Sequence, residues 1–340
     1  MKDIFDLLKL IIPEGIDSLQ NRYRILEYIL YKQPVGRRML AIETQISERI
    51  LRSETELMKE MGLIESSSLG MKVTYKGQFV LDQLFPHMQE LKCLVQLEED
   101  LKEKLQLKKV TIVPGNADEG EATKLQLGKA GSFLLENLLK NSQTIAITGG
   151  TTVEYIVKTM PKLHNRYKDI MIVPARGSIG GKVDLQANTL VAKLAKRLDA
   201  DYRLLNLPDN LSQTTIDSIK NEPQVQKTLQ KVEETDIIIF GIGNALKMAE
   251  RREVSSDIFS MLEQKEAVSE VLGYYFDAKG NTVYSPATIG IDMENALKIK
   301  QRIAIAGGES KASAIFSANK IIKGSYLITD EAAARAILDF

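Results

Sequence analysis

The chain has 340 residues, a length typical of two domains of ordinary size. Its 45 basic and 45 acidic side chains cancel, so a charged binding surface must be local. The single cysteine, Cys93, excludes an intrachain disulfide and a cysteine metal cage. Charges interrupt the apolar N-terminus and no apolar run approaches ~18 residues, so we expect no signal peptide, no membrane span and a cytoplasmic location.

The first 76 residues combine three helical segments with one pair of short strands. Apolar residues at three- and four-residue steps predict an amphipathic helix over 18–31. A short helix over 37–43 and a third over 47–61 follow, and Ser47 is a good N-cap of the third. The stretch LIESSSLGMKVTYKG then predicts a hairpin. This order predicts a winged helix-turn-helix domain over 1–76.

Basic side chains lie at two helix starts of this predicted domain. Residues 20–76 hold ten basic and seven acidic side chains, an excess that is also typical of a solvated surface. Their placement favours double-stranded DNA, because a recognition helix contacts base edges with its N-terminal residues and the preceding helix start faces phosphates. Docking to another protein is the alternative. The predicted DNA-contacting residues are Arg37, Arg38, Ser47, Arg49 and Arg52.

Residues 77–106 are predicted to form a long helix that links two domains. Leucines recur along it, and charged residues fill most of the gaps. Because the stripe lacks a sustained heptad, a solvated connecting helix and a dimer-forming linker both stay open. The leucines are Leu91, Leu94, Leu97, Leu101 and Leu105.

Residues 107–340 alternate β-rich runs with helical stretches. The runs are continuously apolar, and most end on glycine or proline, as strands do when a parallel sheet buries both their faces. We predict a doubly wound α/β domain, in which ligands bind at the carboxyl ends of the strands. The predicted strands are VTIVPG, TIAITGG, IMIVPARG, YRLLNLP, DIIIFGIG, RIAIAGG and SYLITD.

One strand end, ITGGTT, has the composition of an anion-binding loop. Gly149 and Gly150 let the backbone approach an anion, the helix start points its amides outward, and the hydroxyls of Thr151 and Thr152 add donors. The sequence has no G-x-x-x-x-G-K-[ST] pattern, and its GIG lacks the third glycine of a dinucleotide fingerprint. The alternative is a tight strand–helix turn without a ligand.

Cationic side chains follow three other strand ends. Arg176 ends PARG, Arg251 and Arg252 lie in MAERRE, and Lys311 follows a second Gly-Gly pair. Arginine can bind a phosphate through two parallel hydrogen bonds. Cations beside glycine loops at the same edge of a sheet therefore predict a phosphorylated small molecule as ligand.

No catalytic set accompanies these residues. His87 lies in the predicted linker and His164 in a loop, and the sequence has no Ser/His/Asp order, HExxH pattern or metal-ligand cluster. Gln186 and Glu270 could accept hydrogen bonds from sugar hydroxyls, and a lone carboxylate near a sugar more often orients it than acts as a base. We therefore predict a site that binds, with no catalytic residue, no metal and no cofactor.

Motifs in a fixed order extend across nearly the whole chain. Together they resemble the SorC-type (sorbitol operon regulator) family of sugar-binding bacterial transcription factors, and as a set they are specific. PVGRRML and ISERILRSE extend the resemblance through the N-terminal domain. The other motifs are ITGGTT, VPARG with QANT, YRLL, GIG with MAERR, EVLGYYFDAKG and AGGESKASAI.

The resemblance implies a DNA-binding repressor that assembles with itself as a dimer or tetramer. Its implied target is the operon for glyceraldehyde-3-phosphate dehydrogenase and later glycolytic enzymes, and its implied effector is fructose 1,6-bisphosphate, which relieves operator binding. The effector domain would share the fold of sugar-phosphate isomerases and glucosamine-6-phosphate deaminase without their activity. One departure is Glu270, where many members of the wider family have Asp. The implied effector contacts are Gly149, Gly150, Thr151, Thr152 and Lys311 at one phosphate, and Arg176, Gln186, Arg251 and Glu270 at the rest of the ligand.

A second hypothesis is a sugar-phosphate isomerase or deaminase with an accessory winged helix. The missing acid/base set at the strand ends, together with arginines on the helix-turn-helix, favours the repressor.

Overall fold

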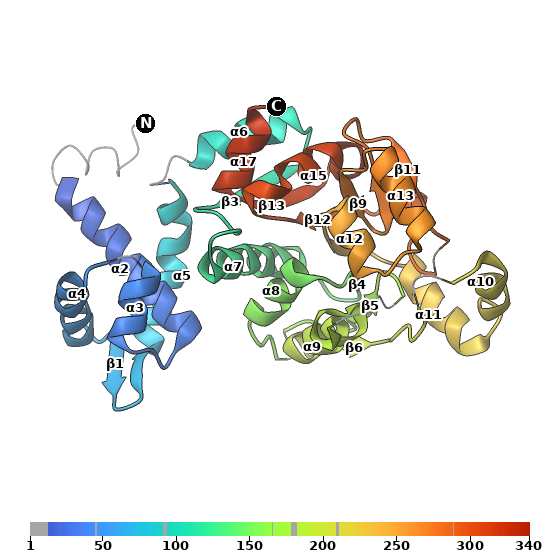
Figure 1. Cartoon of the computed structure of the whole chain (residues 1–340). Helices are drawn as coiled ribbons and strands as arrows, with labels where there is room; N and C mark the ends of the chain where they lie inside the picture. Colours follow the sequence, from blue (N-terminus) through green and yellow to red (C-terminus); the bar gives the residue numbers. More distant parts are fainter. Residues whose placement is uncertain are drawn as a thin grey trace. The chain divides into compact units, whose positions relative to one another are not determined.

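The computed structural model describes residues 13–44, 46–90, 94–164, 166–177, 182–208, 211–287 and 289–340. Contacts within the chain divide it between Leu94 and Val95 into two compact units (Figure 1). Among the described helices, none has the length and apolar character needed to cross a membrane. The predicted domain boundaries at residues 76 and 106 stay predictions.

The N-terminal unit is a winged helix-turn-helix. The hydroxyl oxygen of Ser47 caps the third helix by accepting a hydrogen bond from the amide of Ile50 at 3.4 Å. The two strands pair antiparallel, with Ile64 opposite Val73, and form the wing. The elements are α2 (Pro13–Lys32), α3 (Arg37–Thr44), α4 (Glu48–Glu60), β1 (Ile64–Ser67), β2 (Gly70–Val73) and α5 (Tyr75–Glu90).

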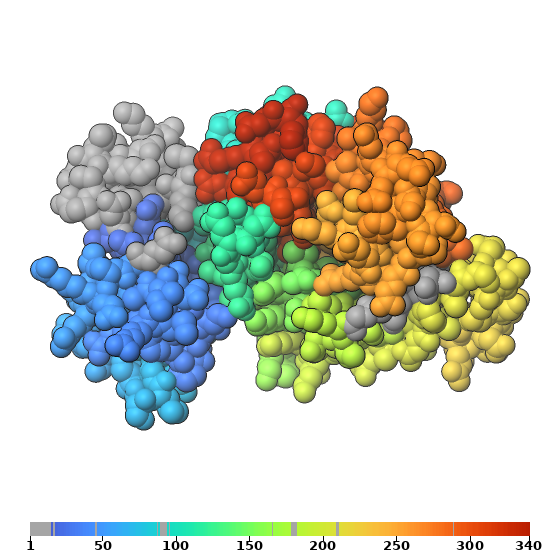
Figure 2. All heavy atoms as spheres, viewed as in Figure 1, coloured from blue at the N-terminus to red at the C-terminus, as the bar shows by residue number. Residues whose placement is uncertain are grey.

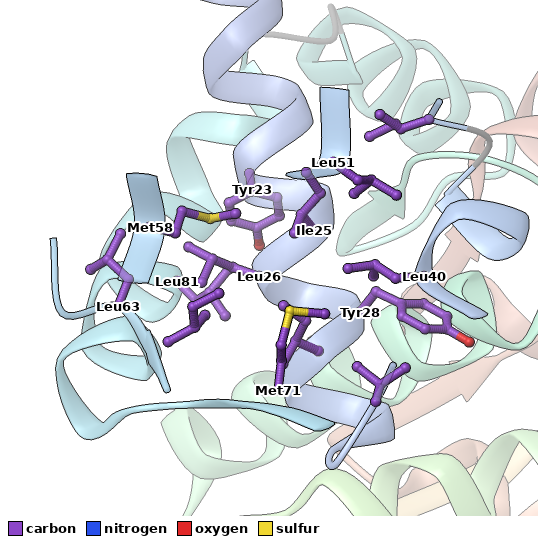
Figure 3. Close-up of a cluster of buried hydrophobic side chains, with 14 of the residues drawn as sticks. Tyr23, Ile25, Leu26, Tyr28, Leu40, Leu51, Met58, Leu63, Met71 and Leu81 are labelled. Carbon is purple, nitrogen blue, oxygen red and sulfur yellow. The ribbon is translucent and has the colours of Figure 1, made fainter. Parts of the chain in front are cut away.

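Apolar side chains from the helices and strands of this unit meet in one core (Figure 3). An ion pair from Arg22 Nε to Glu54 Oε2, 2.5 Å long, also joins α2 to α4. Because the core fixes α3 and α4 against α2, the starts of α3 and α4 keep one orientation and face solvent. Core residues with no exposed surface include Ile25 of α2, Leu40 of α3, Leu51 of α4 and Leu81 of α5.

The predicted linker helix corresponds to two helices, α5 and α6 (Leu94–Lys104), and residues 91–93, with Leu91 and Cys93, lie outside the described residues. The remaining leucines of the stripe are buried. Glu98 of α6 accepts a hydrogen bond from the amide of Ile112 at 2.7 Å, and Lys104 donates to the carbonyl of Leu338 at 3.0 Å. The helix thus packs within its own unit, which argues against a fully solvated connector.

A seven-stranded parallel sheet forms the centre of the C-terminal unit, in the order β3-β13-β12-β7-β4-β5-β6. Each run predicted from the sequence supplies one strand, which confirms the α/β prediction. Neighbouring strands are parallel throughout. The strands are β3 (Lys109–Val113), β4 (Thr144–Ile147), β5 (Met171–Pro174), β6 (Asp201–Tyr202), β7 (Ile237–Gly241), β12 (Gln301–Ile305) and β13 (Tyr326–Asp330).

Strand β6 is much shorter than the run YRLLNLP predicts. The side chain of Asn188 accepts from the amide of Leu205 at 3.1 Å and donates to its carbonyl at 3.0 Å. A side-chain amide therefore replaces the sheet ladder at this position and ends the strand.

Helices cover both faces of the sheet. On strands β3 and β13, α7 lies on one face and α17 on the other (Figure 1). The helices are α7 (Glu121–Leu138), α8 (Thr151–Thr159), α9 (Ala187–Leu198), α10 (Gln213–Ile219), α11 (Pro223–Glu233), α12 (Ala245–Arg251), α13 (Ser256–Gln264), α14 (Met293–Lys298), α15 (Ala312–Ser317), α16 (Asn319–Ile322) and α17 (Glu331–Leu338), with 3₁₀ turns at Val183–Leu185 and Glu309–Lys311.

A small antiparallel sheet, which the sequence did not predict, forms a lobe with α12 and α13. Its order is β11-β10-β9-β8, and Tyr275 is fully buried beneath it together with Leu262. Figure 2 shows this segment, in orange, as a continuous mass of side chains. The strands are β8 (Gly243–Asn244), β9 (Ser269–Val271), β10 (Tyr274–Phe276) and β11 (Thr282–Tyr284).

Helices α7 and α8 pack closely at Gly128, where an added Cβ would lie 2.4 Å from the carbonyl oxygen of Tyr155. We expect Gly128→Ala to lower the free energy of unfolding by roughly 1–3 kcal/mol, despite the better helix propensity of alanine. Urea denaturation measures the change. Gly120→Ala at the N-cap of α7 is the control, because its Cβ would meet no atom closer than 3.9 Å. Equal stability of the two variants would contradict the close packing.

Candidate functional site

The candidate pocket opens where the sheet order reverses. After β4 the chain builds β5 and β6 on one side, and then places β7, β12 and β13 on the other. At such a switch point the loops that follow the two central strands diverge and leave a crevice. The loops after β4 and β7 line a pocket of about 950 Å³ here, a volume measured out to open solvent.

Every effector-contacting residue predicted from the sequence lines this one pocket. These residues come from the loops after β4, β5 and β12, from strand β9, from the starts of α8 and α9 and from the end of α12. Their roles in binding stay predictions, but their convergence from separate strands is a property of the fold. The residues are Gly149, Gly150, Thr151, Thr152, Arg176, Gln186, Arg251, Glu270 and Lys311.

The GGTT loop differs from expectation at Gly150. Its amide donates to the carbonyl of Leu185 at 2.9 Å and is therefore not directed to a ligand. Gly150 has a φ of 119°, which favours glycine, and caps α8. The amide of Glu154 donates to the carbonyl of Gly150 at 3.0 Å, so the amides of Thr151 and Thr152 remain at the open, electropositive end of the helix.

Glycines at two strand ends permit close approach of neighbouring segments. A Cβ on Gly149 would lie 2.6 Å from the carbonyl oxygen of Leu185, and a Cβ on Gly241 would lie 3.3 Å from the hydroxyl of Thr152. That hydroxyl donates to the carbonyl of Ile305, the last residue of β12, at 3.2 Å. The glycines of the GIG segment thus form part of the pocket wall without adding side chains to it.

Arg176 is 4% exposed, although it follows a strand end that opens to the pocket. Its guanidinium lies against Gly273, where a Cβ would be 1.8 Å from Nη1, and Gly273 has a φ of 81°. An isolated backbone bridge to Gly290 holds the same residue from the other side. An arginine stays protonated when buried, so Arg176 is a fixed cation of the pocket.

Glu270 accepts two hydrogen bonds at one carboxylate oxygen. Arg252 Nη2 donates to Oε1 at 2.7 Å, and the amide of Gly273 donates to the same atom. Both charged side chains are largely buried, at 12% exposed for Arg252 and 6% for Glu270. Arg251, the preceding residue, is exposed at the pocket rim. The sequence placed two arginines in one motif, but only the structure separates the paired one from the exposed one.

Two aspartates hold the loop that ends with Lys311. Asp330 Oδ2 accepts from the amides of Ala117 at 2.7 Å and Gly308 at 2.6 Å. Asp118 accepts from the amide of the serine before Lys311 at 2.8 Å and from its hydroxyl at 2.9 Å. Sequence reasoning missed both aspartates, because each acts on backbone far away in the chain.

Burial lowers the pKa of Lys311 below the ordinary lysine value. The carboxylates of Asp118 and Asp330 oppose this shift, while the cations Arg251 and Lys124 add to it. A phosphate beside Lys311 would favour its charged form, so ligand binding and protonation of this amine are linked.

The predicted DNA-contacting residues are exposed at the starts of α3 and α4. Ser47 is engaged as the cap of α4. Other basic groups of this unit are structural, since Arg22 pairs with Glu54 and Arg24 donates to the carbonyl of Thr44 at 3.3 Å. Contact of Arg37, Arg38, Ser47, Arg49 and Arg52 with DNA stays a prediction.

Neither histidine is among the described residues that line the pocket. His87 lies on α5, and His164 is exposed in the loop before β5. Within the described ranges, no group of three or more His, Cys, Asp or Glu side chains could hold a metal ion.

Two family models match consecutive parts of the chain. The "CggR N-terminal DNA binding domain" matches residues 18–88, and the "Putative sugar-binding domain" matches residues 89–339. The first match falls on the winged helix and the second on the α/β unit with its pocket.

Full-length relatives and solved structures agree with these matches. The central glycolytic genes regulator of Priestia megaterium is 38% identical over 340 residues, 99% of each chain. That of Bacillus subtilis is 36% identical over 339 residues, again 99% of each. A SorC family transcriptional regulator from Enterococcus faecalis has a TM-score of 0.68 and 38% identity, over 72% of this chain and 99% of that one. The full-length sorbitol operon regulator SorC from Klebsiella pneumoniae, with a TM-score of 0.66, 21% identity and 95% and 99% coverage, shows the fold alone.

The fold, the pocket and these matches define a DNA-binding transcriptional repressor with a sugar-binding domain. The chain belongs to the family of the central glycolytic genes regulators, within the SorC type. The alternative of an isomerase or deaminase with an accessory winged helix is not supported, because the relatives matched over the whole chain are regulators.

We expect the affinity for phosphate to fall as pH rises. Because the pKa of Lys311 is lowered, this fall should begin at a lower pH than it would with an ordinary lysine. The pKa of Lys311 is lowered in the free pocket, and a bound anion would raise it, so affinity is full below the free value and is lost progressively as pH rises from the free value to the bound value. Titration calorimetry with a sugar phosphate from about pH 7 to 10 measures this, since the ligand is fully ionised there.

Lys311→Arg is the matched control, because a guanidinium stays protonated over this range. The same pH dependence in Lys311→Arg and the wild type would show that Lys311 does not set it.

Proposed function

We propose that the protein represses the operon for glyceraldehyde-3-phosphate dehydrogenase and later glycolytic enzymes, in the cytoplasm, and that fructose 1,6-bisphosphate relieves this repression. The names of the full-length relatives support the target, since both are central glycolytic genes regulators. The main support for the effector is the convergence of cations and glycine loops from separate strands on one pocket. The sequence motifs support the same choice.

The pocket has residues suited to two phosphates. At one end, Thr152 and Lys311 belong to adjoining strand ends, because the Thr152 hydroxyl reaches the last residue of β12. Arg176 and Arg251 provide further cations, one fixed by burial and one at the rim. Glu270 lies among them and supplies a carboxylate oxygen for sugar hydroxyls. A ligand with phosphates at both ends of a short polyol would use all of these groups.

Residues 1–76 are the proposed DNA-binding domain, 77–106 the linker and 107–340 the effector domain. We expect the exposed Arg49 and Arg52 at the start of α4 to contact base edges, and Arg37 and Arg38 at the start of α3 to contact phosphates. One winged helix reads one half-site, so we propose a dimer or tetramer that places two recognition helices on successive turns of the operator.

Thr152→Glu is expected to weaken fructose 1,6-bisphosphate binding about 100-fold or more. A carboxylate at this position would place negative charge and volume where the proposal puts a phosphate. Calorimetry measures the affinity, and Thr152→Ser, which keeps a hydroxyl for the carbonyl of Ile305, is the control. Operator binding without sugar should match the wild type in both variants. Normal sugar binding by Thr152→Glu would locate the phosphate elsewhere.

Fructose 1,6-bisphosphate is expected to weaken operator binding by about 5- to 150-fold, the usual range for coupled sites. Fluorescence anisotropy with labelled operator, across a titration of the sugar, measures the effect, and fructose 6-phosphate tests the need for the second phosphate. Arg52→Ala is the control for specific DNA binding.

An isomerase assay on the same sample distinguishes the second hypothesis. Operator affinity that is identical with and without a sugar shown to bind would rule out the proposed regulation.

A further inference from the structure

The pocket that is proposed to bind an anion contains a buried carboxylate. Of the described residues that line it, Glu270 is the only acid. An unpaired carboxylate within a few ångströms of a phosphate would repel it, and the low dielectric of a buried site strengthens that repulsion. A phosphate ligand can bind beside Glu270 only if another group neutralises the negative charge of this carboxylate.

Arg252 is the group that can neutralise Glu270. Its Nη2 donates to Glu270 Oε1 at 2.7 Å, and both side chains are largely buried, so solvent screens the pair little. Arg251 at the rim has the same charge in a solvated position. The two adjacent arginines at the end of α12 thus have different surroundings, one beside an acid and one at the mouth of the pocket.

The pair also fixes which oxygen of Glu270 faces the ligand. Oε1 accepts from Arg252 and from the amide of Gly273, while Oε2 lies 3.6 Å from the place where a Cβ of Gly243 would be. Gly243 and Glu270 both line the pocket, so Oε2 lies at the pocket wall. An oxygen in that position can accept hydrogen bonds from ligand hydroxyls.

The same carboxylate is joined to Arg176. Gly273, whose amide donates to Glu270, is the residue against which the Arg176 guanidinium packs. A change in the orientation of Glu270 would therefore also move the turn at Gly273, and with it the guanidinium of Arg176.

We propose that Arg252 is a positioning residue that sets the selectivity of the pocket: its ion pair cancels the charge of Glu270 toward phosphate and directs Oε2 to sugar hydroxyls. The inference rests on the proposed function, since it assumes a phosphorylated sugar as ligand. It goes beyond that function because Arg252 is given no contact with the phosphate. Arg252 acts on the ligand only through its ion pair with Glu270.

A double-mutant cycle on the full-length protein tests this role. Arg252→Met, Glu270→Gln and the double variant are titrated by calorimetry with pyrophosphate, which has no hydroxyl groups of a sugar, and with fructose 1,6-bisphosphate. Arg166→Met is the matched control, because it removes an arginine that pairs with Glu136 before β5, outside the pocket.

Arg252→Met should lose pyrophosphate affinity roughly tenfold or more, because it leaves a buried unpaired carboxylate. The double variant should recover to within about threefold of the wild type, because the repelling charge is gone. Arg166→Met should match the wild type. A double variant as weak as Arg252→Met would show that Arg252 binds phosphate directly, and full affinity in Arg252→Met would show that the pair is irrelevant; either result overturns the proposal.

Glu270→Gln decides the matter if Arg252→Met does not fold. With Arg252 released, this variant should bind pyrophosphate at least as tightly as the wild type, while its preference for fructose 1,6-bisphosphate over pyrophosphate falls. An unchanged preference would overturn the inference. A wild type that binds pyrophosphate but not the sugar would overturn the proposed effector, and the charge test with pyrophosphate would still decide the role of Arg252. A wild type that binds neither probe would overturn both.

Discussion

The site depends on backbone segments that approach one another more closely than side chains would permit. Gly149 lies against the carbonyl of Leu185, and Gly273 lies against the guanidinium of Arg176. At Gly308, with a φ of 102°, a Cβ would be 2.4 Å from a carboxylate oxygen of Asp118. Each of these contacts joins two segments that follow different strands. The pocket is therefore a product of the tertiary structure, and a motif such as GGTT supplies only one of its walls.

Charge balance is the second condition of the pocket. Cations gathered in one crevice repel one another, and here acids compensate them: Glu270 beside Arg252, and Asp118 and Asp330 near Lys311. Each acid also accepts backbone amides, so it holds loop geometry at the same time. The arrangement suits recognition of a phosphorylated ligand.

The sequence predicted what depends on local pattern and missed what depends on distant contacts. Buried apolar runs gave all seven strands of the parallel sheet, because a strand covered on both faces is continuously apolar. The same reasoning overestimated β6, where the side chain of Asn188 ends the ladder. It offered the Gly150 amide to a ligand, although the carbonyl of Leu185 takes that amide. The lobe around β9 escaped notice because its strands have two or three residues each, too few for a period to emerge.

An effector alters DNA affinity only if it binds two forms of the protein unequally, so phosphate contacts must depend on something that can differ between forms. The Lys311 loop has such a dependence. It is hydrogen-bonded through Asp118 to the segment that follows β3, and β3 is bonded through the amide of Ile112 to Glu98 of α6. Helix α6 begins where the chain divides into its two units. We propose that a ligand that requires one position of the Lys311 loop also favours one position of the segment that leads to the winged helix. Linkage makes the reverse true as well: constraint of that segment by bound DNA must change phosphate affinity by the same factor.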